Sequence, residues 1–87
     1  MNFINGKLNL IDGDGNAIMK GFDNKILGGF NFLTGDKNIL KGNGSVVEGD
    51  ENLINGDTNS ANGNRNKIKG TNNVALGDDN LAFGDRN

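Results

Sequence analysis

The sequence lacks cysteine, histidine, tryptophan, tyrosine and proline altogether. Without cysteine it has no disulfides and no thiolate metal sites, and without histidine it also lacks the usual general base. Acid–base chemistry would have to rest on carboxylates and lysines alone. These absences predict a protein that is not an enzyme and that uses no cofactor and no metal.

Charge of one sign and long apolar runs are also scarce. The net charge is only −2 over 87 residues, so composition gives no reason to expect a nucleic acid partner. The sequence contains no basic stretch that would favour a membrane surface and no apolar run long enough to span a bilayer. The first residues do not form a secretory signal. We expect one small domain covering residues 1–87.

Glycine, in contrast, is abundant and strictly spaced. It recurs every seven residues from Gly21 to Gly84, and Gly6 and Gly13 belong to the same series, with one extra residue inserted in 13–20. Asparagine follows three residues after these glycines, with Ser45 as the exception, and an aliphatic residue follows two positions later. The repeat G-x-x-N-x-Φ-x, in which Φ is aliphatic, therefore runs along the whole chain.

A period of seven residues first suggests a coiled coil, but the composition of the repeat excludes one. A coiled coil needs two apolar positions per heptad, whereas this repeat has one, and each glycine costs about 1 kcal/mol in a helix. In an extended segment, Asn, Φ and the next Gly instead point to one face. Glycine then allows the chain to turn after a short strand.

The repeat therefore predicts an all-β fold, a parallel β-solenoid or β-roll. Because one heptad is too short to close a coil, we expect about six 14-residue coils with two strands each. The extra residue in 13–20 predicts a bulge in one turn.

The same pattern assigns inward and outward positions. The predicted structural core consists of inward aliphatic residues: Ile4, Ile11, Ile18, Ile26, Leu33, Leu40, Val47, Ile54 and Ile68. Stacked coils also predict a hydrogen-bonded ladder of side-chain amides, formed by Asn9, Asn16, Asn24, Asn31, Asn38, Asn52, Asn59, Asn66, Asn73 and Asn80. Outward apolar rows are candidates for self-association: Phe3, Leu10, Phe32, Ile39, Val46, Leu53, Val74 and Leu81.

The segment from Asn73 to Gly84, NVALGDDNLAFG, resembles the head repeats of trimeric autotransporter adhesins, the YadA-like heads. These also repeat a small polar residue, an aliphatic residue and a glycine in fourteen-residue units. The resemblance implies a left-handed parallel β-roll, assembly of three chains, and binding to a cell-surface or matrix ligand.

The function that the sequence favours is a non-enzymatic, structural one. Open ends of a solenoid present unpaired backbone groups, so we expect head-to-tail self-association into an extracellular fibre or surface appendage. The alternative is a trimeric YadA-like head or a phage-fibre-type module that binds a surface. The expected partners are other copies of the chain, in a filament or a trimer, and, for the alternative function, a cell-surface or matrix ligand. No nucleic acid and no membrane insertion are expected, and the location is extracellular or surface-exposed.

Two further ligands fit the sequence less well. Ice binding would favour a row of threonines, but Thr34, Thr58 and Thr71 fall at three different positions of the repeat. Calcium β-rolls use a nine-residue repeat, whereas the period here is seven. Ice binding therefore stays as a less favoured alternative, and a calcium site is not expected.

Overall fold

The computed structural model describes residues 2–86 as two parallel six-stranded sheets packed face to face, with no helix among them. Neither Met1 nor Asn87, the two ends of the expected domain, lies within the described residues. The strands of sheet A, in spatial order, are β1 (Phe3–Lys7), β3 (Ala17–Phe22), β5 (Phe32–Thr34), β7 (Val46–Glu48), β9 (Ser60–Asn62) and β11 (Val74–Leu76). The strands of sheet B are β2 (Leu10–Asp12), β4 (Lys25–Leu27), β6 (Ile39–Lys41), β8 (Leu53–Asn55), β10 (Lys67–Lys69) and β12 (Leu81–Phe83).

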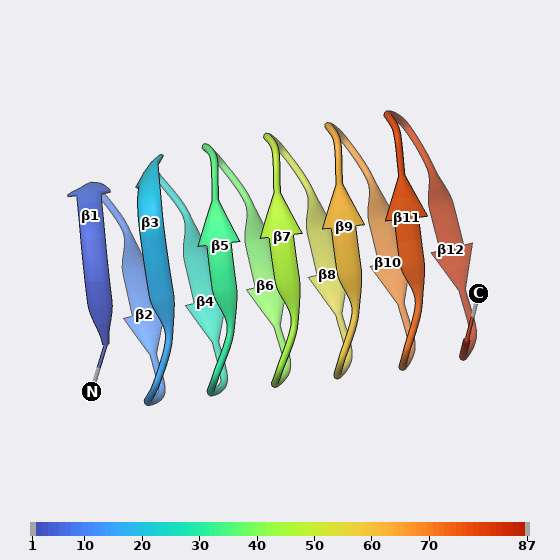
Figure 1. The fold of residues 1–87 in the computed structure, drawn as a ribbon, viewed down its shortest axis with the longest axis horizontal. Coiled ribbons are helices and arrows are strands. Elements are labelled where there is room, and N and C mark those ends of the chain that lie inside the picture. The colour runs from blue at the N-terminus through green and yellow to red at the C-terminus, as the bar shows by residue number, and fades with distance from the viewer. Residues whose placement is uncertain (1, 87) are drawn as a thin grey trace.

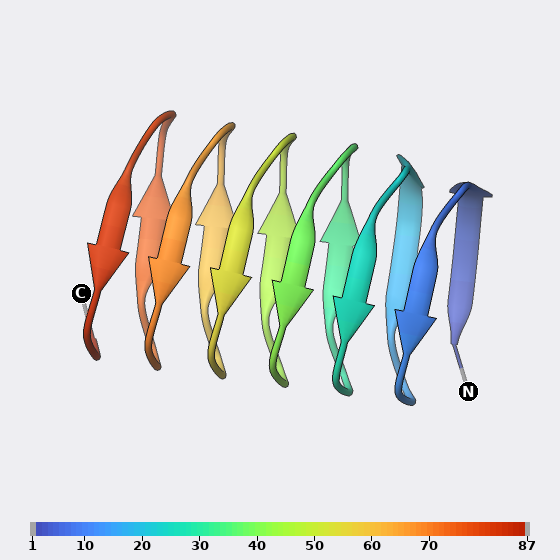
Figure 2. The same cartoon turned by 180° about the vertical axis from the view of Figure 1, so that it is seen from behind.

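The chain winds as a left-handed solenoid. In Figure 1 the strands of sheet A run upward nearer the viewer, and those of sheet B return downward behind them while the chain advances to the right. The view from behind in Figure 2 has the same hand. The Cα atoms span 30 × 21 × 13 Å, so six stacked coils form a short, flat rod. The predicted β-solenoid of about six coils is confirmed.

The heptad explains both sheets, since its Asn and its aliphatic residue point inward in every complete coil. Nine aliphatic side chains form the continuous core: Ile18, Ile26, Leu33, Leu40, Val47, Ile54, Ala61, Ile68 and Ala75. Each strand from β3 to β11 thus contributes a single aliphatic side chain to this core. Fully burying one of the isoleucine, leucine or valine side chains stabilises the fold by about 2 kcal/mol.

The predicted core is wrong at Ile4, whose side chain is 48 % exposed. Ile4 lies in β1, and no described coil packs on its outer side, so the side chain is covered from one direction only. Ile11 on β2 is half-buried for the same reason and packs against the core from its edge. Burial in a solenoid requires a neighbouring coil on each side, which the repeat pattern alone does not supply for the first coil.

The asparagine ladder differs in chemistry from the predicted stack of amides. Asn38 Nδ2 donates to the carbonyl oxygen of Gly49 at 2.7 Å, and its Oδ1 accepts from the backbone N–H of Asn52 at 2.8 Å. Contacts between amides are few, for example Asn38 Nδ2 to Asn24 Oδ1 at 3.2 Å. The ladder is therefore mainly a link from each side chain to the backbone of the next coil.

The expected bulge lies in a strand, and its placement in a turn was wrong. The pairing of β3 with β5 shifts between Ile18 and Lys20, and the pairing with β1 shifts opposite the same segment. Placing the extra residue on the outer side of β3 leaves Ile18 and Gly21 at their inward positions. Sheet A is consequently regular from β5 onward, whereas sheet B pairs without a shift throughout.

Each described turn except the one at Gly21 uses two residues with positive φ. The first is the repeat glycine: at Gly42, with φ of 138°, a Cβ atom would lie 1.9 Å from the carbonyl oxygen of Gly56 in the next coil. The second lies two positions later and is a non-glycine residue in most turns, for example Glu51 and Thr58 with φ of 58° and 59°. The sequence pattern identified the first of these positions and missed the second.

Candidate functional site

The surface of the roll has two faces, one on each sheet, and two edges, which are formed by the turns. We call the outward residues that flank the core aliphatics of each sheet the sheet A face and the sheet B face. Turns that lead from sheet A to sheet B form edge AB, for example residues 49–52, and turns that lead back form edge BA, for example residues 42–45. No group of three or more acidic side chains within residues 2–86 is close enough to hold a metal ion.

The sheet A face consists of two rows with little charge. One row comprises Phe3, Ala17, Phe32, Val46, Ser60 and Val74; the other comprises Asn5, Lys20, Thr34, Glu48, Asn62 and Leu76, with Met19 as the extra residue of the bulge. Over β5, β7, β9 and β11 the residues of both rows pair one to one. Along these four strands Glu48 is the single charged member of either row. The result is a regular surface of mostly uncharged polar and apolar side chains on strands about 4.8 Å apart.

The sheet B face has the same geometry and a different charge. One row comprises Leu10, Lys25, Ile39, Leu53, Lys67 and Leu81; the other comprises Asp12, Leu27, Lys41, Asn55, Lys69 and Phe83. Four lysines stand against one aspartate, and the remaining members except Asn55 are aliphatic or aromatic. The lysines come from three separate strands, so no local stretch of sequence reveals them as a group.

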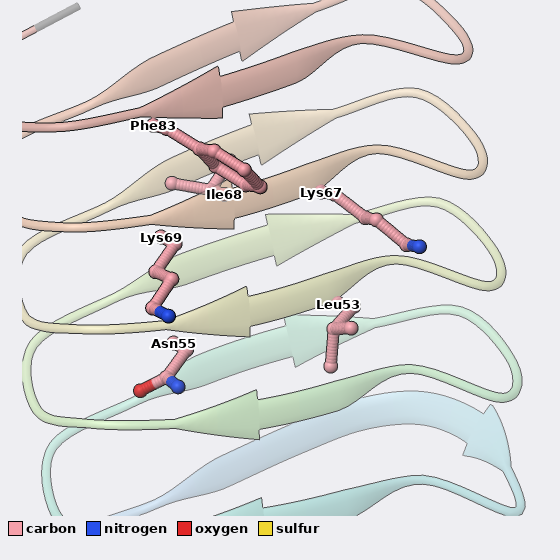
Figure 3. A pocket seen from close by; sticks show the side chains of 6 residues that line it. All are labelled: Leu53, Asn55, Lys67, Ile68, Lys69 and Phe83. Atoms are coloured by element: carbon pink, nitrogen blue, oxygen red, sulfur yellow. The ribbon is translucent and has the colours of Figure 1, made fainter.

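A shallow hollow of about 260 Å³ lies on the sheet B face between the two rows. Figure 3 shows Lys69 and Asn55 in one row, Lys67 and Leu53 in the other, and the ring of Phe83 at the end of the hollow. A second hollow of about 430 Å³ lies where this face meets edge AB, beside Lys25, Lys37 and Asp23. Both hollows are open depressions that combine apolar walls with cationic side chains.

The two edges carry most of the acidic residues, and the aspartates that directly follow a repeat glycine have structural partners. Asp36 Oδ1 accepts the backbone N–H of Phe22, and Asp50 Oδ1 accepts that of Asp36, both at 2.8 Å. Asn43 and Asp57 are linked in the same way on edge BA, at 2.9 Å. These bonds form a second ladder that joins successive turns. The recurring Gly-Asp pairs therefore have a structural role in capping the coil before them.

Charges of alternating sign also follow one another along edge AB: Asp23, Lys37, Glu51, Arg65 and Asp79. Arg65 donates to both carboxylate oxygens of Asp79, at 2.8 and 3.2 Å. These hydrogen bonds hold the pKa of the Asp79 carboxyl below its usual range. Both side chains are more than half exposed, so the pair adds little to stability.

The structure divides the predicted self-association residues between two opposite faces. Phe3, Phe32, Val46 and Val74 lie on the sheet A face, whereas Leu10, Ile39, Leu53 and Leu81 lie on the sheet B face. All eight side chains are exposed. They therefore form two separate surfaces, one nearly neutral and one basic.

The threonines are scattered, as the repeat positions predicted. Thr34 lies on the sheet A face, while Thr58 and Thr71 lie in turns of edge BA. A binding face on this molecule would therefore be built from several residue types that share one regular spacing.

A left-handed parallel β-roll with two flat outer faces is the class of protein that these features define. The model of a family described as "Grass antifreeze beta roll" matches residues 2–87, which is nearly the whole chain, and the chain belongs to this family. A search among curated proteins gives no match. The β-roll implied by the resemblance to YadA-like heads is correct, but the family that matches is the antifreeze roll.

Proposed function

We propose that this protein binds ice, and that the sheet A face is the binding surface. The observation that carries this proposal is the run of paired rows over β5, β7, β9 and β11, in a chain that belongs to an antifreeze β-roll family. Val46, Ser60 and Val74 in one row, and Thr34 and Asn62 in the other, repeat at a fixed spacing on a flat sheet.

Flatness and low charge are the properties that an ice surface requires. Ice is a neutral, regular lattice of water, so a complementary surface gains by releasing weakly held water from apolar groups over a large flat area. Exposed lysine and glutamate side chains hold their own hydration and keep a lattice at a distance. The sheet A face satisfies this condition better than the sheet B face, which carries four lysines.

The stacked backbone supplies the rigidity that such binding needs. Buried Asn52 donates to the carbonyl of Gly63 at 2.8 Å, and its Oδ1 accepts from the backbone N–H of Asn66 at 2.9 Å. Similar links hold each coil to the next along the roll. A face that is already ordered loses little conformational entropy when it meets a crystal. The absence of a threonine row argued against ice binding in the sequence, but Val, Ser, Thr and Asn at one spacing provide the same flat repeat.

The test compares two lysine substitutions at equivalent positions on opposite faces. Val46 on β7 and Leu53 on β8 both precede a core residue and are 46 % and 39 % exposed. We expect Val46→Lys to abolish most of the thermal hysteresis and the inhibition of ice recrystallisation, because it places a hydrated charge in the centre of the face. Leu53→Lys should leave both activities intact, since sheet B already carries lysine in the same row.

A third variant should act in the opposite direction. Glu48→Thr removes the single charge from the regular part of the sheet A face and should raise the hysteresis. Loss of activity in Leu53→Lys but not in Val46→Lys would assign ice binding to sheet B. Equal activity in all three variants, or none in the parent protein, would overturn the proposal.

Self-association and surface adhesion are the competing proposals for the exposed apolar residues. Among the strands of residues 2–86, β1 and β12 each have one edge without a pairing partner, which favours head-to-tail stacking, and the resemblance to YadA-like heads favours a trimer. Light scattering over a concentration series separates these assemblies from a monomer. In each case the protein acts without catalysis, and its place outside the cell stays a prediction.

A further inference from the structure

We propose that the sheet B face docks the protein onto the surface of an anionic lipid bilayer. This proposal does not depend on ice binding, because it concerns the opposite side of the roll. The chain has no basic stretch, but the coils bring Lys25, Lys41, Lys67 and Lys69 onto one flat face. The interaction is a contact with the membrane surface and involves no insertion of a spanning segment.

Charge is segregated around the molecule in a way that defines the orientation of docking. The sheet B face carries four lysines and one acidic residue, Asp12, while the whole protein has a net charge of −2. The rest of the chain therefore carries five more negative than positive charges. The two edges border the sheet B face with acidic residues such as Asp50 and Asp57. An anionic plane is attracted to the sheet B face and repelled by the edges, so the molecule meets it flat.

The residues between the lysines favour a lipid surface over a hydrated polyanion. Leu53 and Phe83 line the hollow beside Lys67 and Lys69, and Asn55 is the one neutral polar side chain in the two rows (Figure 3). Recognition of an acidic polysaccharide would use several amide or hydroxyl groups and aromatic rings with a polar handle. Leucine and phenylalanine interleaved with lysine instead suit the boundary between headgroups and acyl chains, where lysine stems lie along apolar surface with their charge in water.

The experiment measures sedimentation of the full chain with vesicles of phosphatidylcholine mixed with phosphatidylglycerol, beside vesicles of pure phosphatidylcholine. We expect binding to the anionic vesicles that weakens as salt is added. Each lysine near an anionic surface contributes about fivefold to the partition coefficient at low salt. The triple variant K25Q/K67Q/K69Q should therefore lose about a hundredfold.

A charge-matched control separates docking by this face from a general effect of net charge. K7Q/K20Q/R86Q removes three positive charges that lie outside the sheet B face and should lose less than threefold. In the other direction, Asp12→Asn on the sheet B face should strengthen binding about fivefold, whereas Glu48→Gln on the sheet A face should leave it unchanged. Circular dichroism melting of every variant reports whether the roll is intact.

Three outcomes would overturn the proposal: equal losses in the two triple variants, equal binding to neutral and anionic vesicles, or binding to polygalacturonate without binding to vesicles. Val46→Lys distinguishes this proposal from ice binding. It should lose ice activity and keep vesicle binding, while K25Q/K67Q/K69Q should behave in the opposite way. If the parent protein shows only one of the two activities, the same variants still test that activity.

Discussion

At the scale of the residue, the turns reveal two glycine roles that the sequence does not distinguish. Gly42 has φ of 138° and lies under the next coil, where a Cβ atom would overlap the carbonyl oxygen of Gly56. Gly44 has φ of 67°, and no atom lies within 4 Å of a Cβ atom built there. In other turns the position of Gly44 is occupied by residues such as Glu51 and Thr58. The first glycine is required for coil stacking, whereas the second only relieves backbone strain.

Alanine substitutions at these two glycines should therefore differ sharply. Gly42→Ala should lower the free energy of unfolding by about 3 kcal/mol or more, because it forces the backbone of two coils apart at an unfavourable φ. Gly44→Ala should cost about 1 kcal/mol, the penalty for an L-residue in the left-handed region. Urea unfolding followed by circular dichroism measures both. Equal costs would mean that coil stacking does not depend on the repeat glycine.

At the scale of the element, each strand depends on its asparagine as much as on its aliphatic residue. Asn38 is fully buried and links the backbone of its own coil to the coils on both sides. Ser45 occupies the same repeat position and keeps one of these roles, since its Oγ accepts the backbone N–H of Asn59 at 3.1 Å. An acceptor at this position is therefore the more general requirement, and the amide donor adds a second link.

Substitutions at Asn38 should follow that order. Asn38→Leu has a similar size but leaves the N–H of Asn52 and the carbonyl of Gly49 unsatisfied in a buried site, so we expect a loss of about 3 kcal/mol or more. Asn38→Ser should retain the acceptor, as Ser45 does, and cost less than half as much. Thermal and urea unfolding measure the difference. A Leu variant as stable as the parent would show that burial alone holds the coils together.

The fold could be predicted from the sequence because every heptad has the same residue pattern. Asn, Φ and Gly at alternate positions fix the inward face, the strand length and the turn in each unit. Burial at Ile4 could not be predicted, because it depends on a neighbouring coil and not on the residue itself. The sequence does not show that the extra residue is Met19 in β3, because one added residue lengthens the heptad equally whether it lies in the strand or in the turn.

The candidate faces were harder to predict than the fold. The exposed positions of Val46 and Leu53 follow from the repeat, but their separation onto a neutral face and a basic face requires the coils to be closed. Lys25 and Lys67 are distant in the sequence and share one row only in the folded roll. The threonine positions in the sequence disfavour ice binding, whereas flatness and spacing are properties of the whole sheet.

At the scale of the whole molecule, the two heptads of a coil are equivalent inside and different outside. Val47 on β7 and Ile54 on β8 pack in the same core, so the heptads that carry them are interchangeable as far as the core is concerned. The outward residues do not share this equivalence, because Ser60 lies on the neutral face and Lys67 on the basic one. The core therefore depends on a period of seven residues, and each face depends on a period of fourteen.

Two deletions should separate these periods. Removal of residues 46–59 takes out one coil and should leave a folded roll with a shorter sheet A face and reduced hysteresis. Removal of residues 46–52 takes out one heptad, so Leu53 pairs with Phe32 and the lysines of β10 move to sheet A. Both proteins should melt at similar temperatures, but the second should lose ice activity. Unfolding of the shorter deletion alone would show that the two heptads are not equivalent in the core.

The equivalence of the heptads has a consequence for how such a gene lengthens. A duplication of seven codons would leave the core intact. It would also move every later strand to the opposite sheet, so that the neutral and basic faces change sides beyond the duplication. Only duplications of fourteen codons extend a working surface. The core thus tolerates insertions of any multiple of seven residues, whereas the faces tolerate only multiples of fourteen. Under selection for one binding face, the protein should therefore lengthen by whole coils.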